Sequence, residues 1–321
     1  DSINLELNKF NSDEKISVEL YLSNEVKKST TNGDAFSSDI IITNIDNYLT
    51  PSFNHSNGGR IDSIINCDVI FDEYHELISD LGLYSCFINI MRTRHRFTNA
   101  KTLLLSATPT NVHTLWDSLG CETVILPNKD THYPAPHNKK YKINVLDDLP
   151  LIDKDSSSLI ILNSISNVQR NRNMLNCDTL FHSKFTDEDR ANLTNKICSN
   201  YDKKSERTLT KFNVISSPIL QASLDISFNK LYESVLSPET SLQRIGRCDR
   251  WGDYDNQGEI NFIRYENRGE NILRETLYTK ELSNKWIDFI TSLDGKELTL
   301  DELYTLYNEY NKINKDTLLR N

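Results

Sequence analysis

Short apolar segments, each bounded by polar or turn-forming residues, recur along the first part of the chain and predict buried β-strands. They lie at residues 40–42, 69–71, 103–105 and 124–126. Helical patterns separate these segments, and such alternation is typical of a parallel sheet that helices cover on both faces. The pattern therefore predicts a first α/β domain over residues 1–126.

A different pattern follows this domain. Residues 127–141 contain three prolines among polar residues, which predicts an extended linker. Residues 142–265 again have an α/β pattern, and residues 266–321 show apolar residues at helical spacing, with a capping-box signature formed by Thr299 and Glu302. The strands predicted in the second α/β domain are residues 159–162, 179–181, 212–215 and 260–263.

Composition narrows the class of protein. The chain has 37% hydrophobic and 26% charged residues, which is typical of a soluble globular protein, and no run of about 18 apolar residues predicts a membrane span. Six cysteines without a C-x-x-C pair indicate reduced thiols and a cytoplasmic location. The net charge of −10 argues against coating nucleic acid by bulk attraction, although a groove with local positive charge remains compatible with it.

Two adjacent acids end the apolar segment 69–71. Asp72 and Glu73 in this position form a Walker B arrangement, in which one carboxylate holds Mg²⁺ and the next orients the attacking water. The alternative is a pair of acids that open a helix, where the helix dipole favours them. His75 completes the D-E-x-H signature and favours the catalytic interpretation.

Three arginines surround a glycine in the second domain. Gln243 precedes Arg244, Arg247 and Arg250, and the guanidinium group offers several fixed donors that suit phosphate. A motor that hydrolyses ATP between two lobes needs such charges from the opposite lobe, at the developing charge of the γ-phosphate. The alternative is an exposed basic helix turn.

Other polar segments admit simpler interpretations. Ser106 and Thr108 follow a predicted strand and either couple the nucleotide site to the nucleic-acid face or cap the next helix as an ST-turn. Arg92, Arg94, His95 and Arg96 are most simply explained as a solvated loop. Tyr304, Tyr307 and Tyr310 are most simply explained by helix packing, and Trp251 by a cap on the core of the second domain.

In their order along the chain, these segments resemble superfamily 2 DExH helicases, and more narrowly the helicase part of the CRISPR-associated helicase–nuclease of type I systems. The pairing of S-L-D-I-x-F with S-L-x-Q-R-I-G-R-x-x-R-W-G is specific to this resemblance, although Ser241-Leu242-Gln243 is one residue shorter than that pattern at its start. The resemblance implies two RecA-like lobes with parallel sheets, followed by a C-terminal helical segment. The segments that carry it are residues 40–49, 158–169, 182–190, 223–228 and 241–251.

Residue roles follow from this resemblance position by position. It implies that Asp72 holds Mg²⁺ and that Glu73 is the general base for water. It also implies that Arg250 is the arginine finger, and it places Asp225 at the nucleotide ribose. The resemblance also assigns Gln243 and Arg247 to the γ-phosphate. It assigns contacts with the nucleic-acid backbone to Thr43, Ser183 and Ser217. It assigns the coupling of the nucleotide site to the nucleic-acid face to Ser106 and Thr108.

The chain also departs from the family pattern. Ser217, Pro218 and Gln221 stand where the family usually has Thr, Gln and Glu. No G-x-x-x-x-G-K-[ST] phosphate-binding loop occurs, and Gly295-Lys296 fails the pattern because Glu297 follows it. With Asp1 in place of an initiator Met, we expect the downstream part of a longer helicase whose first lobe is incomplete here. A natural remnant without ATPase activity is the alternative.

The resemblance implies a monomeric ATP-driven translocase on single-stranded DNA that works with a CRISPR surveillance complex, using ATP and Mg²⁺. The family's nuclease domain, with its own divalent metal, would lie upstream. The alternatives are a catalytically inactive binding protein and a generic DExH RNA helicase. The central expectation is that the acidic pair and the three arginines converge on one triphosphate.

Overall fold

The chain folds into two compact units in a computed structural model. Unit 1 comprises residues 1–109 and 116–121, and unit 2 comprises residues 110–115 and 122–321. The described residues are 17–22, 25–29, 38–49, 61, 64–74, 77, 81–105, 136–175, 177–201, 211–221, 224–264 and 280–313. The predicted strand at 124–126, most of the predicted linker, and the predicted coupling residues Ser106 and Thr108 lie outside them.

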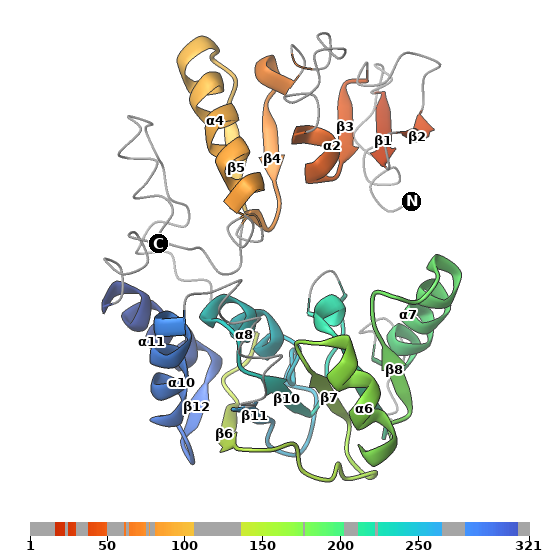
Figure 1. The fold of residues 1–321 in the computed structure, drawn as a ribbon, viewed down its shortest axis with the longest axis vertical. Coiled ribbons are helices and arrows are strands. Elements are labelled where there is room, and N and C mark those ends of the chain that lie inside the picture. The colour runs from red at the N-terminus through yellow and green to blue at the C-terminus, as the bar shows by residue number, and fades with distance from the viewer. Residues whose placement is uncertain are drawn as a thin grey trace. The chain divides into compact units, whose positions relative to one another are not determined.

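Unit 1 contains two small sheets (Figure 1). In the first, β1 pairs in parallel with β3 and antiparallel with β2; in the second, β4 and β5 form a parallel pair. The strands at residues 40–42, 69–71 and 103–105 are confirmed, with shifts of at most one residue at their ends. The elements are β1 (Val18–Leu22), β2 (Glu25–Ser29), β3 (Ile40–Thr43), α2 (Ile45–Leu49), β4 (Val69–Phe71), α4 (Leu81–Phe97) and β5 (Thr102–Leu104).

Aromatic packing holds β4 in unit 1. Phe71, at the end of β4, meets Tyr48 of α2 edge-on with ring centroids 5.1 Å apart, and Phe87 of α4 at 4.9 Å. All three side chains are buried, and edge-to-face contacts of this kind add stabilisation beyond the burial of apolar area. This cluster fixes the strand that ends on the acidic pair.

The basic cluster at residues 92–96 is helical, and its prediction as a solvated loop is wrong. It forms the last turns of α4, and Arg94 is only 1% exposed. The Arg94 guanidinium donates to backbone carbonyls that precede β4 and β5, and to the Thr102 hydroxyl. A long basic side chain can therefore sit in the interior when enough oxygens accept its donors.

Unit 2 is built on a seven-stranded sheet in the order β12-β6-β11-β10-β7-β9-β8. The pairings are parallel except for β12, which runs antiparallel to β6 at one edge. The mixed α/β architecture with mainly parallel sheets confirms the predicted fold class. The strands are β6 (Lys140–Leu146), β7 (Ser158–Ile161), β8 (Thr179–Phe181), β9 (Asn213–Ser216), β10 (Lys230–Ser234), β11 (Glu259–Ile263) and β12 (Glu297–Thr299).

Helices cover both faces of this sheet, and alternate residues of each strand serve opposite faces. Leu159 and Ile161 of β7 belong to the larger core, which includes residues of α7, α8, α10 and α11, whereas Ile160 belongs to a smaller core with α6. Near-continuous apolar strands are expected for a sheet buried on both sides. The helices are α6 (Ile165–Leu175), α7 (Asp187–Tyr201), α8 (Pro238–Ile245), α10 (Lys280–Thr291) and α11 (Leu300–Ile313).

The carboxyl-terminal residues form part of the core of unit 2. Trp286, Tyr307 and Tyr310 are buried there, which confirms helix packing as the explanation for the last two. The predicted capping box is also confirmed, because the Thr299 amide donates to Glu302 Oε2 at 2.7 Å and the Glu302 amide donates to Thr299 Oγ1 at 3.2 Å. The helical pattern did not predict β12, which joins this region to the main sheet.

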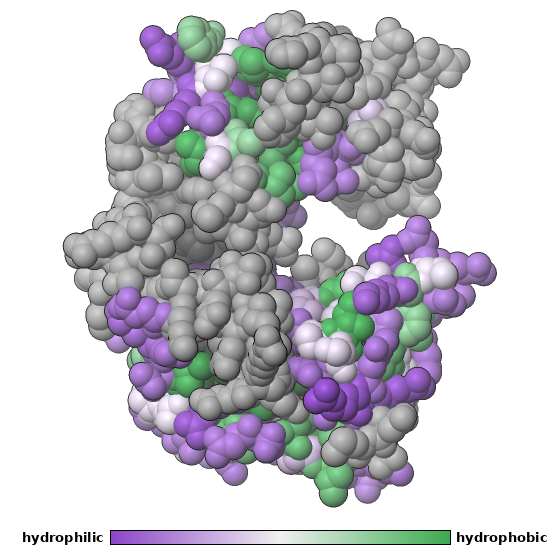
Figure 2. All heavy atoms as spheres, viewed as in Figure 1, coloured by the Kyte–Doolittle hydropathy of each residue, from purple (hydrophilic) through white to green (hydrophobic). Residues whose placement is uncertain are grey.

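Along the described chain, no helix combines the length and apolar character needed to cross a bilayer. In the view of Figure 2, hydrophilic residues dominate the described surface of unit 2, whereas several apolar residues reach the surface over α4, β4 and β5 in unit 1.

Candidate functional site

The predicted acidic pair lies at the carboxyl end of β4, where open α/β sheets build their sites. Asp72 and Glu73 are both exposed. The turn that carries them is tied to the end of β5, because the Leu105 amide donates to the Phe71 carbonyl at 2.8 Å and the Tyr74 amide donates to the Leu105 carbonyl at 3.3 Å. Glu73 has a positive φ of 51°, a backbone conformation that residues other than glycine rarely adopt.

The acidic pair fits a magnesium ion that has few protein ligands. Mg²⁺ usually keeps several waters and takes one or two carboxylates together with phosphate oxygens of the substrate. Asp72 offers one exposed carboxylate, and the described residues contain no group of three or more His, Cys, Asp or Glu that could enclose a metal. The local chemistry therefore suits an ion held mainly by water and phosphate, with Asp72 as its protein ligand.

In unit 2, helix α8 carries the predicted glutamine and the first arginine. Its start is fixed by a capping box, in which Ser237 Oγ accepts from the Thr240 amide and the Thr240 hydroxyl accepts from the Ser237 amide, with Pro238 in the first turn. The helix ends at Ile245, and Gly246 is its C-cap residue, just before Arg247. We call residues 246–254, which follow the helix, the arginine turn.

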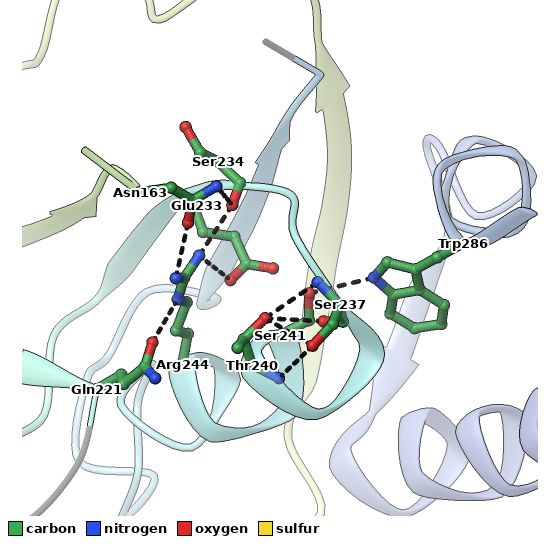
Figure 3. A network of polar contacts seen from close by, with 9 residues as sticks. All are labelled: Asn163, Gln221, Glu233, Ser234, Ser237, Thr240, Ser241, Arg244 and Trp286. Atoms are coloured by element: carbon green, nitrogen blue, oxygen red, sulfur yellow. Dashed lines mark hydrogen bonds and ion pairs between the residues drawn. The ribbon is translucent and has the colours of Figure 1, made fainter. Parts of the chain in front are cut away.

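Arg244 is fully buried and cannot reach a nucleotide. The prediction that all three arginines of this motif serve phosphate is therefore wrong for Arg244. Figure 3 shows its guanidinium surrounded by acceptors from three other parts of unit 2. It donates to Gln221 Oε1 at 3.1 Å and to Asn163 Oδ1 at 2.9 Å. It also donates to the Ser234 carbonyl at 2.8 Å and pairs with Glu233 Oε2 at 3.5 Å.

Glu233 is the residue that the sequence analysis missed in this network. It is 0% exposed on β10, and burial raises the pKa of its carboxyl group while Arg244 and the Ser241 hydroxyl lower it. Taking both charges out of water is unfavourable unless geometry and further hydrogen bonds compensate. The pair therefore fixes α8 against β10 and makes Arg244 a structural residue.

The other two arginines lie differently. Arg247 and Arg250 are partly exposed in the arginine turn, and Arg247 Nη2 donates to the Gln221 carbonyl at 3.1 Å. Arg250 Nε lies 3.0 Å from Asp225 Oδ1, with the two side chains 38% and 61% exposed. Two residues predicted independently, the arginine finger and the ribose acid, are thus brought into direct contact. Gln243 is partly buried near the end of α8.

The predicted nucleic-acid contacts lie at strand ends in both units. In unit 2, Ser183 and Ser217 follow the neighbouring strands β8 and β9, and the Ser217 amide donates to the Phe181 carbonyl at 3.0 Å. Ser183 is exposed, whereas Ser217 is only 4% exposed. In unit 1, Thr43 ends β3, and its buried hydroxyl oxygen has no hydrogen-bond partner among the described residues.

The acids belong to unit 1 and the arginines to unit 2. Their convergence on one triphosphate therefore stays a prediction. Within unit 2 alone, the geometry gathers Arg247, Arg250 and Asp225 around one turn.

The sequence that carries this turn is similar to a known protein family. Residues 154–253, which include β7 to β10, α8 and all but the last residue of the arginine turn, match a family model described as CRISPR-associated nuclease/helicase Cas3, C-terminal. A protein of Methanocaldococcus jannaschii named CRISPR-associated nuclease/helicase Cas3 is 25% identical over 315 residues. The chain is related to the helicase part of Cas3. The matched region covers 89% of this chain and 41% of the Methanocaldococcus protein.

Solved structures agree on the fold. The crystal structure of T. fusca Cas3 with ATP has a TM-score of 0.68 and 16% identity, covering 90% of this chain and 40% of that one. A chain in a structure described as CRISPR RNA-guided surveillance complex, pre-nicking, has a TM-score of 0.68 and 16% identity, with the match covering 88% of this chain and 42% of that one. These likenesses support the RecA-like fold expected for the two α/β units.

Proposed function

We propose that the chain supplies the DExH acids and the arginine pair of an ATP-dependent translocase that acts on single-stranded DNA in type I CRISPR interference. In this proposal Asp72 holds Mg²⁺ bound to ATP, and Glu73 accepts the proton of the attacking water. Arg247 and Arg250 act on the γ-phosphate, together with Gln243. The motor is monomeric and cytoplasmic, and its partner is a CRISPR surveillance complex.

One observation carries this proposal. Arg247 and Arg250 are partly exposed beside Asp225, within the segment that matches the Cas3 family model, whereas Arg244 of the same motif is buried and neutralised. One motif therefore places its first arginine in the core, leaves the other two guanidinium groups accessible, and pairs Arg250 with an exposed acid. An arginine finger needs both an accessible guanidinium and a partner that aims it.

An apolar face in unit 1 supports the view that the motor is larger than this chain. Ile70 on β4 is 65% exposed, and its register partner Leu103 on β5 is 47% exposed. Leu105, which follows β5, is 42% exposed. Parallel sheets are normally covered on both faces. We propose that the strand and helix of a phosphate-binding loop, supplied from outside the chain, cover this face.

Substitution of Glu73 by Gln in the complete protein tests the catalytic assignment. We expect DNA-stimulated ATP hydrolysis to fall by on the order of 10³-fold, because the water loses its general base while the side chain keeps its size. Nucleotide binding, followed by fluorescence of a labelled ATP analogue, should stay unchanged. Glu188→Gln, at an exposed acid of α7, is the matched control and should hydrolyse ATP at the normal rate. A Glu73→Gln protein with normal hydrolysis would refute the assignment.

A second candidate is a binding protein without catalysis, and the missing G-x-x-x-x-G-K-[ST] pattern favours it. Such a protein would bind single strands or a surveillance complex passively. The chain by itself and the chain extended by a phosphate-binding segment distinguish the two functions. The enzyme is favoured if only the extended protein hydrolyses ATP, and the passive binder if neither does while both retain strand binding.

A further inference from the structure

The segment that leads into β6 contacts the arginine turn directly. His137 Nε2 lies 2.6 Å from the Asp249 carbonyl oxygen, and the Tyr141 hydroxyl donates to the same oxygen at 3.4 Å. Lys139 Nζ donates to the Tyr254 carbonyl at 2.6 Å. His137, Lys139 and Tyr141 all lie in the stretch 127–141 that was predicted as a linker.

The hydrogen bonds around His137 define its tautomer. The Lys139 backbone N–H donates to His137 Nδ1 at 3.2 Å, so this nitrogen acts as an acceptor. Nε2 then carries the proton and donates to the Asp249 carbonyl. Both ring nitrogens of His137 are therefore used, one to fix the ring against its own segment and one to hold the arginine turn.

Two glycines in unit 2 make room for this segment. Gly252 has a φ of +72°, and a Cβ atom built on it would lie 2.7 Å from His137 Cγ and Cδ2. A Cβ atom on Gly258 would lie 2.9 Å from Tyr141 Cδ1. Contacts shorter than 3 Å between carbon atoms are strongly repulsive, so the ring of His137 needs glycine at position 252.

The atom that His137 holds belongs to a strained residue. Asp249 has a φ of 37°, in the left-handed region that residues with a Cβ atom rarely adopt. Its amide donates to the Phe228 carbonyl at 2.7 Å, and its carbonyl also accepts from the Gly252 amide at 3.0 Å. Asp249 lies directly between Cys248 and Arg250, so its conformation sets the direction in which Arg250 leaves the turn.

We infer that His137 is a positioning residue for the arginine pair. By donating to the Asp249 carbonyl, it holds the left-handed turn that aims Arg250 toward Asp225 and keeps Arg247 at Gln221. The inference deepens the proposed function and, in its catalytic part, rests on it. His137 touches neither substrate nor nucleotide in this scheme and acts only through the backbone of the turn.

Hydrogen exchange tests whether His137 holds the arginine turn, and this test needs no measurement of catalytic activity. In His137→Ala we expect the amides of Arg250 and Gly252 to exchange at least about tenfold faster, because the carbonyl of Asp249 loses its shortest hydrogen bond. His137→Gln, whose side-chain amide nitrogen reaches a similar position, should restore most of the protection. His95→Ala, at an exposed histidine of α4, is the matched control and should leave the turn unchanged. Unchanged exchange in His137→Ala would overturn the inference.

The catalytic half is measured in the complete protein. We expect His137→Ala to lower kcat for ATP by roughly 10- to 100-fold, because misplacing a catalytic group by about 1 Å has effects of this size. The KM for DNA should not change, and His137→Gln should recover most of kcat. Unchanged kcat in His137→Ala, alongside an inactive Glu73→Gln, would refute positioning while the proposed function stands. If Glu73→Gln also stays active, the proposed function fails, and the exchange result still decides whether His137 holds the turn.

Discussion

Among the described residues, each unit contains one arginine that is almost completely withdrawn from water, and the two guanidinium groups have different kinds of partner. Arg94 in unit 1 is 1% exposed, and Arg244 in unit 2 is 0% exposed. The acceptors described for Arg94 are neutral oxygens of the backbone and of Thr102. Arg244 instead faces a carboxylate, that of Glu233, together with neutral oxygens.

The difference teaches what each arginine does. Arg94 ties the segments that precede β4 and β5 to α4, so it organises the strand ends opposite to the acidic pair. Arg244 joins α8 to β10 and also binds Gln221, whose carbonyl accepts from Arg247. The first is a clamp on the backbone, whereas the second is a buried ion pair that supports the arginine turn.

The largest effect is expected at the ion pair. Arg244→Met leaves the buried Glu233 carboxylate without its cation, and removing one partner of such a pair typically costs about 3–5 kcal/mol. The slowest-exchanging amides of β10 would report the lower free energy of opening. The double substitution Glu233→Leu with Arg244→Met is the control, because replacing the whole pair by apolar side chains of similar size is often far milder. A double variant as unstable as Arg244→Met would show that the pair's geometry, and not its charge, stabilises unit 2.

The stability of the same variant should depend more strongly on pH than that of the unchanged protein. Burial raises the pKa of Glu233 and Arg244 lowers it, so the native pKa rises further above its ordinary value once the arginine is removed. In the window between the unfolded and native pKa values the native state binds more protons, and stability therefore falls as pH rises. Arg244→Met should thus lose less stability in mildly acidic buffer than at neutral pH. An equal loss at both would mean that Glu233 does not titrate in that window.

The sequence predicts a strand well when its residues are all apolar, and poorly when the strand carries buried polar residues. The apolar run Leu159–Leu162 predicts β7 to within one residue at each end, but β10 was not predicted, because a buried glutamate and serine interrupt its apolar pattern. Only the distant Arg244 makes that glutamate compatible with the core, and local patterns carry no such information. For the same reason, the contact between Arg250 and Asp225 was not predictable from spacing, although both residues were predicted to serve the nucleotide site.

A smaller effect is expected at the backbone clamp. Arg94→Met removes five donor contacts, yet the Ile64, Ile65 and Lys101 carbonyls each accept from a second donor, namely the Tyr48 hydroxyl, the Thr98 hydroxyl and the Val69 amide. No buried charge is left behind. We expect a loss of about 2 kcal/mol, measured by exchange of the β4 amides. A loss as large as that of Arg244→Met would show that neutral carbonyls depend on a buried cation as strongly as a carboxylate does.

The smallest effect is expected at an ion pair near the surface, between Arg264 and Asp147. Arg264 Nη2 lies 2.5 Å from Asp147 Oδ1, but the two side chains are 35% and 83% exposed, so water competes for both charges. Exposed pairs typically contribute about 0–1 kcal/mol, and Arg264→Met should lower stability by no more than that in an exchange measurement on β11. Added salt should reduce the difference further, because screening acts on exposed charges far more than on buried ones. A loss comparable to that of Arg94→Met would show that contact geometry, and not withdrawal from water, sets what an arginine contributes to this protein.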